Sequence, residues 1–310
     1  MSESVCSPSI EIWLTDVRAY ISEKAPALLP MLEVYSGEAR FGRRYIAEDL
    51  LRLHRGAAVL EIGAGSLLLS CQLMKEGFAV TALEPGGAGF FNASELQAIV
   101  SIYAKNLGIA PKIISFPAER FSGENAFDFA FSINVMEHVE SVSEALRNVC
   151  KAIKPGGTYR FTCPNYLFPY EPHFDIPTLF SKRLTEYVLR KLIFRDGRVD
   201  DPAGLWQSLN WITVPRVIRV AHGLSDIRVR FNQKIFGDAM ARVLSDKQFA
   251  ARRSWWVRKL ARGLVHLGAH HIMAYLPPHF QPVMDCILEK WQVSSRGAVP
   301  HLHEARKVGA

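Results

Sequence analysis

The fold is decided by residues 59–71, VLEIGAGSLLLSC. An apolar run that ends in two glycines and is followed by a second apolar run predicts a buried strand, a tight turn and a helix capped by Ser66. Glycines at such a turn let the backbone approach a ligand at the start of a helix. Glu61 adds a carboxylate two residues before Gly63. The stretch therefore predicts a ligand site at the first strand–helix connection.

The residues that follow repeat the order of strand and helix. Buried-strand patterns occur at 57–62, 78–83, 112–116, 127–134 and 158–163, with helical patterns at 66–76, 93–106 and 142–153. This alternation is typical of an α/β fold with a doubly wound parallel sheet. In such sheets a ligand binds beyond the carboxyl ends of the strands, where Gly63, Gly65 and Glu84 fall.

The neighbours of the two glycines narrow the class of ligand. A dinucleotide fingerprint requires a third glycine where Leu68 stands. Glu61 also places negative charge where a pyrophosphate would approach, whereas a ligand with an ammonium group tolerates a carboxylate there. Glu84 ends the second strand and is placed to accept both hydroxyls of a ribose. A nucleotide-dependent oxidoreductase is thus the less favoured interpretation.

Four motifs in this order resemble the S-adenosylmethionine-dependent class I methyltransferases, in particular the branch that includes the ubiquinone-pathway O-methyltransferases. They are 61-EIGAG-65, Glu84, 127-FDFAFSINVMEHV-139 and 146-LRNVCKAIKPGG-157. The resemblance covers about residues 40–235 and, more loosely, 282–291. It implies S-adenosyl-L-methionine as the cofactor and a mostly parallel seven-stranded sheet, in which 283–290 is the last, antiparallel strand.

The resemblance also implies a set of cofactor-binding residues. Glu61 would support the ammonium end of the cofactor, Glu84 its ribose, and the Ala118 backbone N–H its adenine. Pro117 stands where the family usually has an acidic residue, so Glu119 is a weaker candidate. The full set is Glu61, Gly63, Gly65, Glu84, Ala118 and Asn134. A structural acid in a cap or turn is the alternative for Glu61 and for Glu84.

The segment 163-CPNYLFPYEPHFD-175 follows the fifth strand and should overhang the methyl group. Methyl transfer to oxygen needs alignment and removal of one proton. His173 has a suitable pKa for a base and Glu171 could orient it, which makes these two the catalytic candidates. The alternative is a structural loop. Glu137 and His138 belong to a family signature that is more often scaffold than substrate contact.

Five domain segments are expected from these patterns. They are a helical leader at 1–55, a cofactor-binding core at 56–235 with a lid at 165–225, a helical insertion at 236–281, the last strand at 282–292 and a tail at 293–310.

Charge is unevenly distributed along the chain. Residues 181–310 hold 22 Lys and Arg against 10 Asp and Glu, which leaves 15 against 20 for residues 1–180, so the two parts carry +12 and −5. Within 252–275, cations and apolar residues alternate in the pattern of an interfacial helix, which predicts a peripheral contact with anionic membrane. A merely basic surface and an ordinary helix docked on the sheet are the alternatives.

Cysteine and apolar content indicate the compartment. The five cysteines are scattered without a metal-binding or disulfide spacing, so no metal site and a reducing compartment are expected. No apolar run reaches the ~18 residues of a membrane span. We therefore expect a cytoplasmic protein, peripheral to the membrane if the basic segment binds lipid. No base-flipping motif follows the fourth strand, and nucleic acid is not an expected partner.

Together these patterns predict an enzyme, a methyltransferase that acts on a small-molecule or lipid-linked acceptor, with oxygen as the favoured acceptor atom. A catalytically silent homologue that binds a ligand or partner is the second alternative, because the sequence does not identify the acceptor.

Overall fold

The computed structural model describes residues 8–86, 91–179, 181–197, 199, 201–246, 250, 253–273 and 275–291. The expected tail at 293–310 lies outside the described residues. So do Gly87–Gly89 of the turn after Glu84, and Arg252 and Ala274 of the expected interfacial segment.

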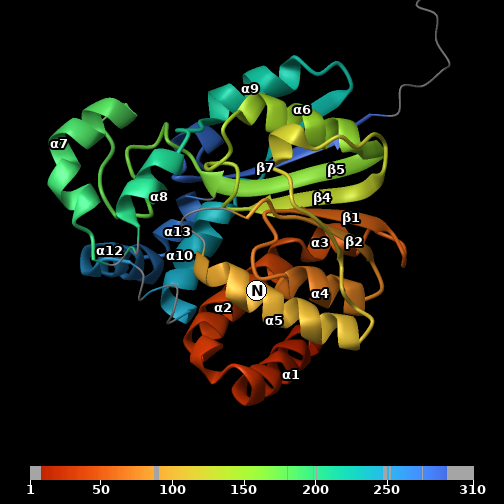
Figure 1. Cartoon of the computed structure of the whole chain (residues 1–310). Helices are drawn as coiled ribbons and strands as arrows, with labels where there is room; N and C mark the ends of the chain where they lie inside the picture. Colours follow the sequence, from red (N-terminus) through yellow and green to blue (C-terminus); the bar gives the residue numbers. More distant parts are fainter. Residues whose placement is uncertain are drawn as a thin grey trace, which may run out of the picture.

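Seven strands of the described chain form one central sheet (Figure 1). They are β1 (Ala58–Ile62), β2 (Ala79–Leu83), β3 (Lys112–Ile114), β4 (Phe127–Ile133), β5 (Ile153–Pro164), β6 (Ile227–Phe231) and β7 (Val283–Lys290). Their order is β3-β2-β1-β4-β5-β7-β6, and β7 runs antiparallel to both of its neighbours while the other pairs are parallel. The expected doubly wound, mostly parallel sheet with an antiparallel last strand is confirmed.

Helices cover both faces of the sheet (Figure 1). On one face lie α1 (Pro8–Lys24), α2 (Leu29–Tyr45), α3 (Ala47–Leu50), α4 (Leu68–Lys75) and α5 (Phe91–Asn106). On the other lie α6 (Val142–Ala152) and α9 (Val214–His222). The lid contains α7 (Lys182–Phe194) and α8 (Pro202–Ser208), and α10 (Ile235–Ser245), α12 (Trp255–His266) and α13 (Ala269–Met273) follow β6. Short 3₁₀ turns span Pro26–Leu28, Ala118–Arg120 and Pro278–Phe280.

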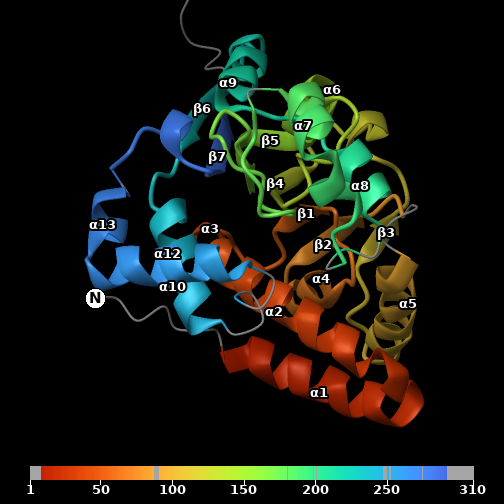
Figure 2. The same ribbon diagram turned by 90° about the vertical axis from the view of Figure 1, so that its left-hand side faces the viewer.

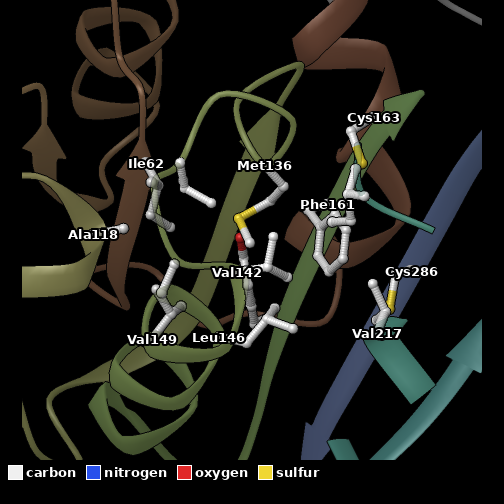
Figure 3. Close-up of a cluster of buried hydrophobic side chains, with 14 of the residues drawn as sticks. Ile62, Ala118, Met136, Val142, Leu146, Val149, Phe161, Cys163, Val217 and Cys286 are labelled. Carbon is white, nitrogen blue, oxygen red and sulfur yellow. The ribbon is translucent and has the colours of Figure 1, made fainter. Parts of the chain in front are cut away.

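Two apolar cores hold these layers together, because side chains alternate across a strand. In β4, Ala130 packs into the core beneath α6 and α9, whereas Phe129 and Phe131 pack into the core beneath α1, α2 and α4. Figure 3 shows Val142 and Leu146 of α6 beside Phe161 of β5. The sheet is therefore buried on both sides, and the ends of its strands remain the places where a ligand can approach.

Three local expectations are corrected. Ser66 does not cap the helix: α4 begins at Leu68, its N-cap position is Leu67 with φ of 64°, and no side chain caps it. The turn closes instead through the Leu67 N–H, which donates to the Ala64 carbonyl at 2.9 Å. β3 ends at Ile114 rather than at residue 116, and β5 extends from Ile153 because that residue pairs with Phe127.

Among the described residues, no helix has both the length and the hydropathy needed to cross a bilayer.

Candidate active site

The glycine turn between β1 and α4 is packed against the end of β4. Gly63 has φ of 73°, and a Cβ added there would lie 2.3 Å from Cγ2 of Val135. Gly65 has φ of 48°, in the same left-handed region. Only glycine meets both demands at position 63, so the sequence brings the turn into direct contact with the residue that follows Asn134.

Glu84 lies at this turn, one residue beyond β2. Its Oε2 accepts a hydrogen bond from the Gly65 backbone N–H at 2.7 Å, and its Oε1 accepts from Gly86 N–H at 3.2 Å. The Gly65 carbonyl accepts in turn from Gln97 Nε2 at 2.9 Å. The structure therefore brings Glu84 and Gly65 together and fixes both backbone groups of the glycine.

Glu61 is buried within β1, and its Oε2 accepts a hydrogen bond from the Ser70 hydroxyl on α4. Burial raises the pKa of Glu61 to about 8, against the lowering effect of that hydrogen bond. The Glu61 carboxyl is thus buried beside the turn, with the Ser70 hydroxyl as a neutral partner. A nearby cation would favour its charged form, so the site fits the ammonium group that the resemblance implies for it.

The structure places the adenine candidates between β3 and α6. Ala118 is buried at the start of a 3₁₀ turn. The Glu119 carboxylate accepts from the Ser141 backbone N–H at 3.2 Å, and Asn148 Nδ2 donates to the Glu119 carbonyl at 2.6 Å. Glu119 thus has a structural partner at the start of α6. Asn134, the last candidate, directly follows β4, has φ of 55° and donates its N–H to the Thr162 carbonyl at 2.8 Å.

His173 and Glu171 form a hydrogen-bonded pair. His173 Nδ1 lies 2.6 Å from Oε1 of the fully buried Glu171. Glu171 also accepts from the Phe174 backbone N–H at 2.7 Å and from the Tyr166 hydroxyl at 3.3 Å. Burial alone would lower the pKa of His173, but the hydrogen bond and charge of Glu171 outweigh it and raise the pKa. This geometry leaves Nε2 of His173 as the atom that can take a proton.

Glu137 and His138 lie beside this pair, and from the sequence a scaffold role was favoured for them over substrate contact. The rings of His138 and His173 have centroids 5.4 Å apart. Ser208 donates its hydroxyl to the Leu205 carbonyl, so it must accept from His138 Nδ1, 2.8 Å away, which makes His138 Nδ1 the protonated nitrogen. Burial lowers the pKa of His138 to about 3, so this ring is neutral.

The Glu137 carboxyl is buried, and neither of its oxygens has a hydrogen-bond partner in the described structure. Burial raises its pKa to about 7. A buried polar group without a partner is costly, and a bound ligand is one explanation for it. Because Val135 touches Gly63, the short segment from Val135 to His138 connects the glycine turn to His173.

The lid supplies two residues that the sequence did not single out. Asn210 N–H donates to the Glu137 carbonyl at 2.8 Å, and its Nδ2 donates to the Met136 and Val139 carbonyls. Trp211 stacks on Tyr166 with ring centroids 4.3 Å apart, and its Nε1 is buried without a partner. These contacts join residues distant in the sequence, so no local pattern could have indicated them.

Three of these side chains could hold a metal ion. One ligand atom each of Glu137, His138 and His173 lies within 4.8 Å of the others. The His138 Nε2 and Glu137 Oε1 atoms are 4.0 Å apart, wider than the ~3–3.5 Å between ligands around a tetrahedral ion with bonds of ~2.1 Å. The set would have to contract to bind one, and the expectation of no metal stays a prediction.

A separate pocket of about 540 Å³ lies at the other end of the strands, where β4 starts at Phe127 and β1 starts at Ala58. Asp128, Thr158 and Lys290 are among its lining residues. It shares no residue with the turn or with the His173 pair.

Comparison with known proteins gives the family. A family model described as a methyltransferase domain matches residues 38–210. An uncharacterized protein of Mycobacterium tuberculosis is 47% identical over 278 residues, 90% of this chain and 94% of that protein. A ubiquinone biosynthesis O-methyltransferase of Paramagnetospirillum magneticum is 33% identical over 121 residues, which is 39% of this chain and 45% of that enzyme.

Among solved structures, an S-adenosylmethionine-dependent methyltransferase from Mesorhizobium loti aligns with a TM-score of 0.50 at 13% identity, covering 80% of this chain and 97% of that one. This likeness concerns the fold alone. The family model spans more than half of the chain and includes the glycine turn, Glu84 and the segment from Asn134 to His173. The chain therefore belongs to the S-adenosylmethionine-dependent methyltransferase family.

Proposed function

We propose that this methyltransferase transfers the methyl group to a hydroxyl oxygen of a small-molecule or lipid-linked acceptor, with His173 as the base and Glu171 as its orienting partner. The observation that carries the proposal is the 2.6 Å hydrogen bond between His173 Nδ1 and the buried Glu171 carboxylate. An imidazole fixed in this way has one free nitrogen and a raised affinity for protons, as a base for an alcohol requires.

The core residues 56–235 would bind the cofactor, and the lid at 165–225 together with the insertion at 236–281 would serve the acceptor. On the cofactor side we assign the backbone of Gly63, Gly65 and Asn134 to the methionine end, with Glu61 at the ammonium. Glu84 would accept the ribose hydroxyls, and the backbone of Ala118 would meet the adenine. The left-handed backbone at Asn134 supports this assignment, because non-glycine residues held in that conformation gather at binding sites, and the two glycines let the backbone approach a ligand.

The cofactor supplies an electrophilic methyl group on a sulfonium, and the protein supplies alignment and a proton acceptor. His173 Nε2 would take the hydroxyl proton while the acceptor oxygen takes up the methyl group, and the electron pair of the broken carbon–sulfur bond would remain on the sulfur. Glu171 then stabilises the imidazolium through Nδ1–H. The products are the methylated acceptor, the demethylated cofactor and one proton, which His173 later releases to water.

Unpartnered groups on three residues indicate the chemistry of the acceptor: Glu137 lies near His173, Asn210 is bonded to the Glu137 carbonyl, and Trp211 stacks on Tyr166, which bonds Glu171. Glu137 presents two oxygens, Asn210 presents Oδ1, and Trp211 presents the donor Nε1. Buried groups of this kind need hydrogen-bond partners, which an acceptor with several hydroxyls would provide. A polar, polyhydroxylated head group therefore fits this region better than an unsubstituted apolar ring.

For localisation we propose the cytoplasm, with peripheral attachment to the membrane. The described cysteines Cys71, Cys150, Cys163 and Cys286 are all free and buried, in keeping with a reducing compartment.

The test is incubation of the purified protein with isotopically labelled cofactor and extracts, followed by mass spectrometry of the products. We expect a labelled methyl ether that is absent when His173→Ala replaces the wild type. A labelled product carrying the methyl on nitrogen or carbon would overturn the assignment of oxygen. Cofactor binding without any labelled product in lipid and soluble extracts would favour the silent homologue.

A further inference from the structure

The lid helix α7 turns an apolar stripe away from the protein. Its exposed residues Leu184, Tyr187 and Val188 precede a kink at Leu189, and exposed Leu192 follows it. Tyr187 is 84% exposed, whereas Thr185 and Ile193 are buried on the inner side. Spacings of three and four place Leu184, Tyr187 and Val188 on one side of the helix before the kink. A stripe of this kind marks a contact surface, since scattered exposure would not repeat at helical spacing.

The helices α12 and α13 present apolar side chains as well. Trp255 is 68% exposed, and Trp256 and Leu260 are exposed with it. Leu267, Ile272 and Tyr275 continue the exposed set beyond α12. Only Ala261 of α12 is buried, in the helix that packs against α10.

These two groups lie on one side of the molecule, although about seventy residues separate them in the sequence. In Figure 1 both α7 and α12 lie at the left-hand side, and Figure 2 shows them both facing the viewer when that side is turned forward. We call this surface the interfacial face. Its exposed apolar residues are Leu184, Tyr187, Val188 and Leu192 of α7 and Trp255, Trp256 and Leu260 of α12.

The interfacial face is bordered by cations. Residues 253–275 contain no Asp or Glu, and Arg258, Lys259 and Arg262 are exposed on α12. Arg183 and Lys191 are exposed on α7, and Arg195 directly after it. Within the described chain, no ion pair involves Arg258, Lys259 or Arg262. Exposed indoles beside unpaired cations match the headgroup zone of an anionic bilayer.

The start of α12 is hydrogen-bonded to the loop that carries His173. Asp175 accepts from the Ser254 backbone N–H at 2.5 Å and from the Tyr170 hydroxyl at 2.5 Å. Arg253 donates to the carbonyl of Pro172, the residue before His173. The rings of Tyr170 and Trp256 meet edge to face with centroids 6.2 Å apart. The interfacial face and the proposed base are thus parts of one connected structure.

We propose that the interfacial face binds the surface of an anionic lipid bilayer and that this contact sets the His173 loop above a lipid-linked acceptor. The position of the acceptor rests on the proposed methyl transfer, whereas bilayer binding does not. Trp255, Tyr187 and Leu260 enter the headgroup zone, and the cations of α7 and α12 meet lipid phosphates. The acceptor then reaches His173 by lateral diffusion.

A bilayer fits this face better than a second copy of the chain. Two copies that met through the interfacial face would bring together two surfaces that are bordered by the same cations, and like charges oppose such contact. An anionic surface turns the same cations into an attraction, each adding up to ~1 kcal/mol.

The test is flotation of the full-length protein with vesicles of phosphatidylglycerol and phosphatidylcholine, in the absence of cofactor and acceptor. We expect the protein to float at 50 mM salt and to stay behind at 1 M salt or with pure phosphatidylcholine. The triple variant Arg258→Gln, Lys259→Gln, Arg262→Gln should bind about tenfold to a hundredfold more weakly. The double variant Tyr187→Ser, Trp255→Ser should lose binding with its charges intact.

Matched controls separate this inference from the proposed function. The triple variant Arg52→Gln, Lys105→Gln, Lys112→Gln removes the same charge from exposed positions outside the interfacial face and should float like the wild type. Calorimetric cofactor binding should be unchanged in every variant. No flotation at low salt would overturn the inference, as would equal loss in both triple variants. If light scattering detects dimers of the wild type and Leu260→Asp dissociates them, the interfacial face binds a second copy of the chain and the inference is overturned.

Discussion

The Glu84 carboxylate lies 2.7 Å from the backbone nitrogen of Gly65 and accepts its hydrogen. This bond joins the end of β2 to the glycine turn after β1, so the acid is held at the ligand edge before any ligand arrives. Glu84 retains further acceptor capacity, because a carboxylate can accept about four hydrogen bonds. A preformed carboxylate of this kind loses little entropy when it binds a ribose.

Glu84→Ala should weaken cofactor binding by roughly 1.5–3 kcal/mol, the range for charge-assisted hydrogen bonds. Calorimetry on the folded variant measures the change. Glu119→Ala is the matched control, since its carboxylate bonds the Ser141 N–H and its loss should affect stability more than affinity. Equal affinity of wild type and Glu84→Ala would remove Glu84 from the cofactor site.

Glu61 should couple cofactor binding to pH. Its pKa is about 8 in the ligand-free protein, so the carboxyl is mostly protonated at pH 7. An ammonium group favours the carboxylate and lowers that pKa, so binding at pH 7 should release about one proton, and affinity should rise about tenfold from pH 6 to pH 7.5. Calorimetry in buffers of different ionisation enthalpy counts the proton.

The control for this linkage is Glu61→Gln, which cannot titrate. Its affinity should be lower than that of the wild type at pH 7.5 and should stay flat across the same range. The same titration affects folding, because the pKa of Glu61 in the folded protein is above its ordinary value of 4.5. The contribution of Glu61 to the unfolding free energy is fully present below pH 4.5 and declines as the pH rises toward 8. Relative to the wild type, the unfolding free energy of Glu61→Gln should therefore be higher above pH 8 than it is at low pH.

Much of the fold follows from the sequence because its signals are local. The apolar runs of the strands, the turn at Gly63 and the end of the helical pattern before Gly77 are each encoded within a few residues. The start of α4 was missed because Leu67 adopts a left-handed φ that leucine rarely takes, and it does so where the turn packs against Val135. That contact comes from the segment that follows β4, far away in the sequence, and has no local signature.

The candidate site, like the fold, was predictable from the sequence only where its signals are local. Glu171 and His173 were paired from the sequence because they lie two residues apart on one stiff loop. The neighbourhood of Glu137 was not foreseen, since its unpartnered carboxyl is evident only after the lid has brought Asn210 to its backbone carbonyl. Contacts across the fold decide which polar groups are left without partners, and a single sequence does not encode them as a pattern.

The buried network around Arg160 should carry much of the stability at the junction of β5 and β7. Arg160 Nη2 lies 2.6 Å from Asp285 Oδ2, and its Nη1 lies 2.7 Å from Asp49 Oδ2. Asp285→Ala would leave a buried guanidinium with one carboxylate, at an expected cost of about 3–5 kcal/mol in unfolding free energy. Urea unfolding followed by circular dichroism measures it. Glu289 lies on β7 as Asp285 does, and it forms an exposed ion pair with Arg230 of β6. Glu289→Ala breaks that pair and should cost less than ~1 kcal/mol in unfolding free energy.

His173→Ala should reduce turnover by about a hundredfold or more and leave cofactor affinity nearly unchanged. Because a base acts in its neutral form and the pKa of His173 is raised, wild-type turnover should increase with pH through a value above 6.5. Glu171→Gln removes the charge that raises the pKa, so the acid limb should move to lower pH while the maximal rate falls. An unshifted limb in Glu171→Gln would assign the titration to another group.

Chelation distinguishes a histidine base from a metal-assisted reaction. If His173 Nε2 takes the proton, dialysis against EDTA should leave turnover within about twofold, because no ion is needed to lower the pKa of the hydroxyl. A metal held by Glu137, His138 and His173 would behave differently: activity would be lost on chelation and restored by Zn²⁺ or Mg²⁺. Glu137→Gln sharpens the comparison, since it should abolish metal-dependent turnover, whereas a histidine base should keep its turnover with the acid limb moved to lower pH, because the Glu137 charge also raises the pKa of His173. Chelator-sensitive turnover that recovers on adding an ion would therefore move His173 from base to ligand.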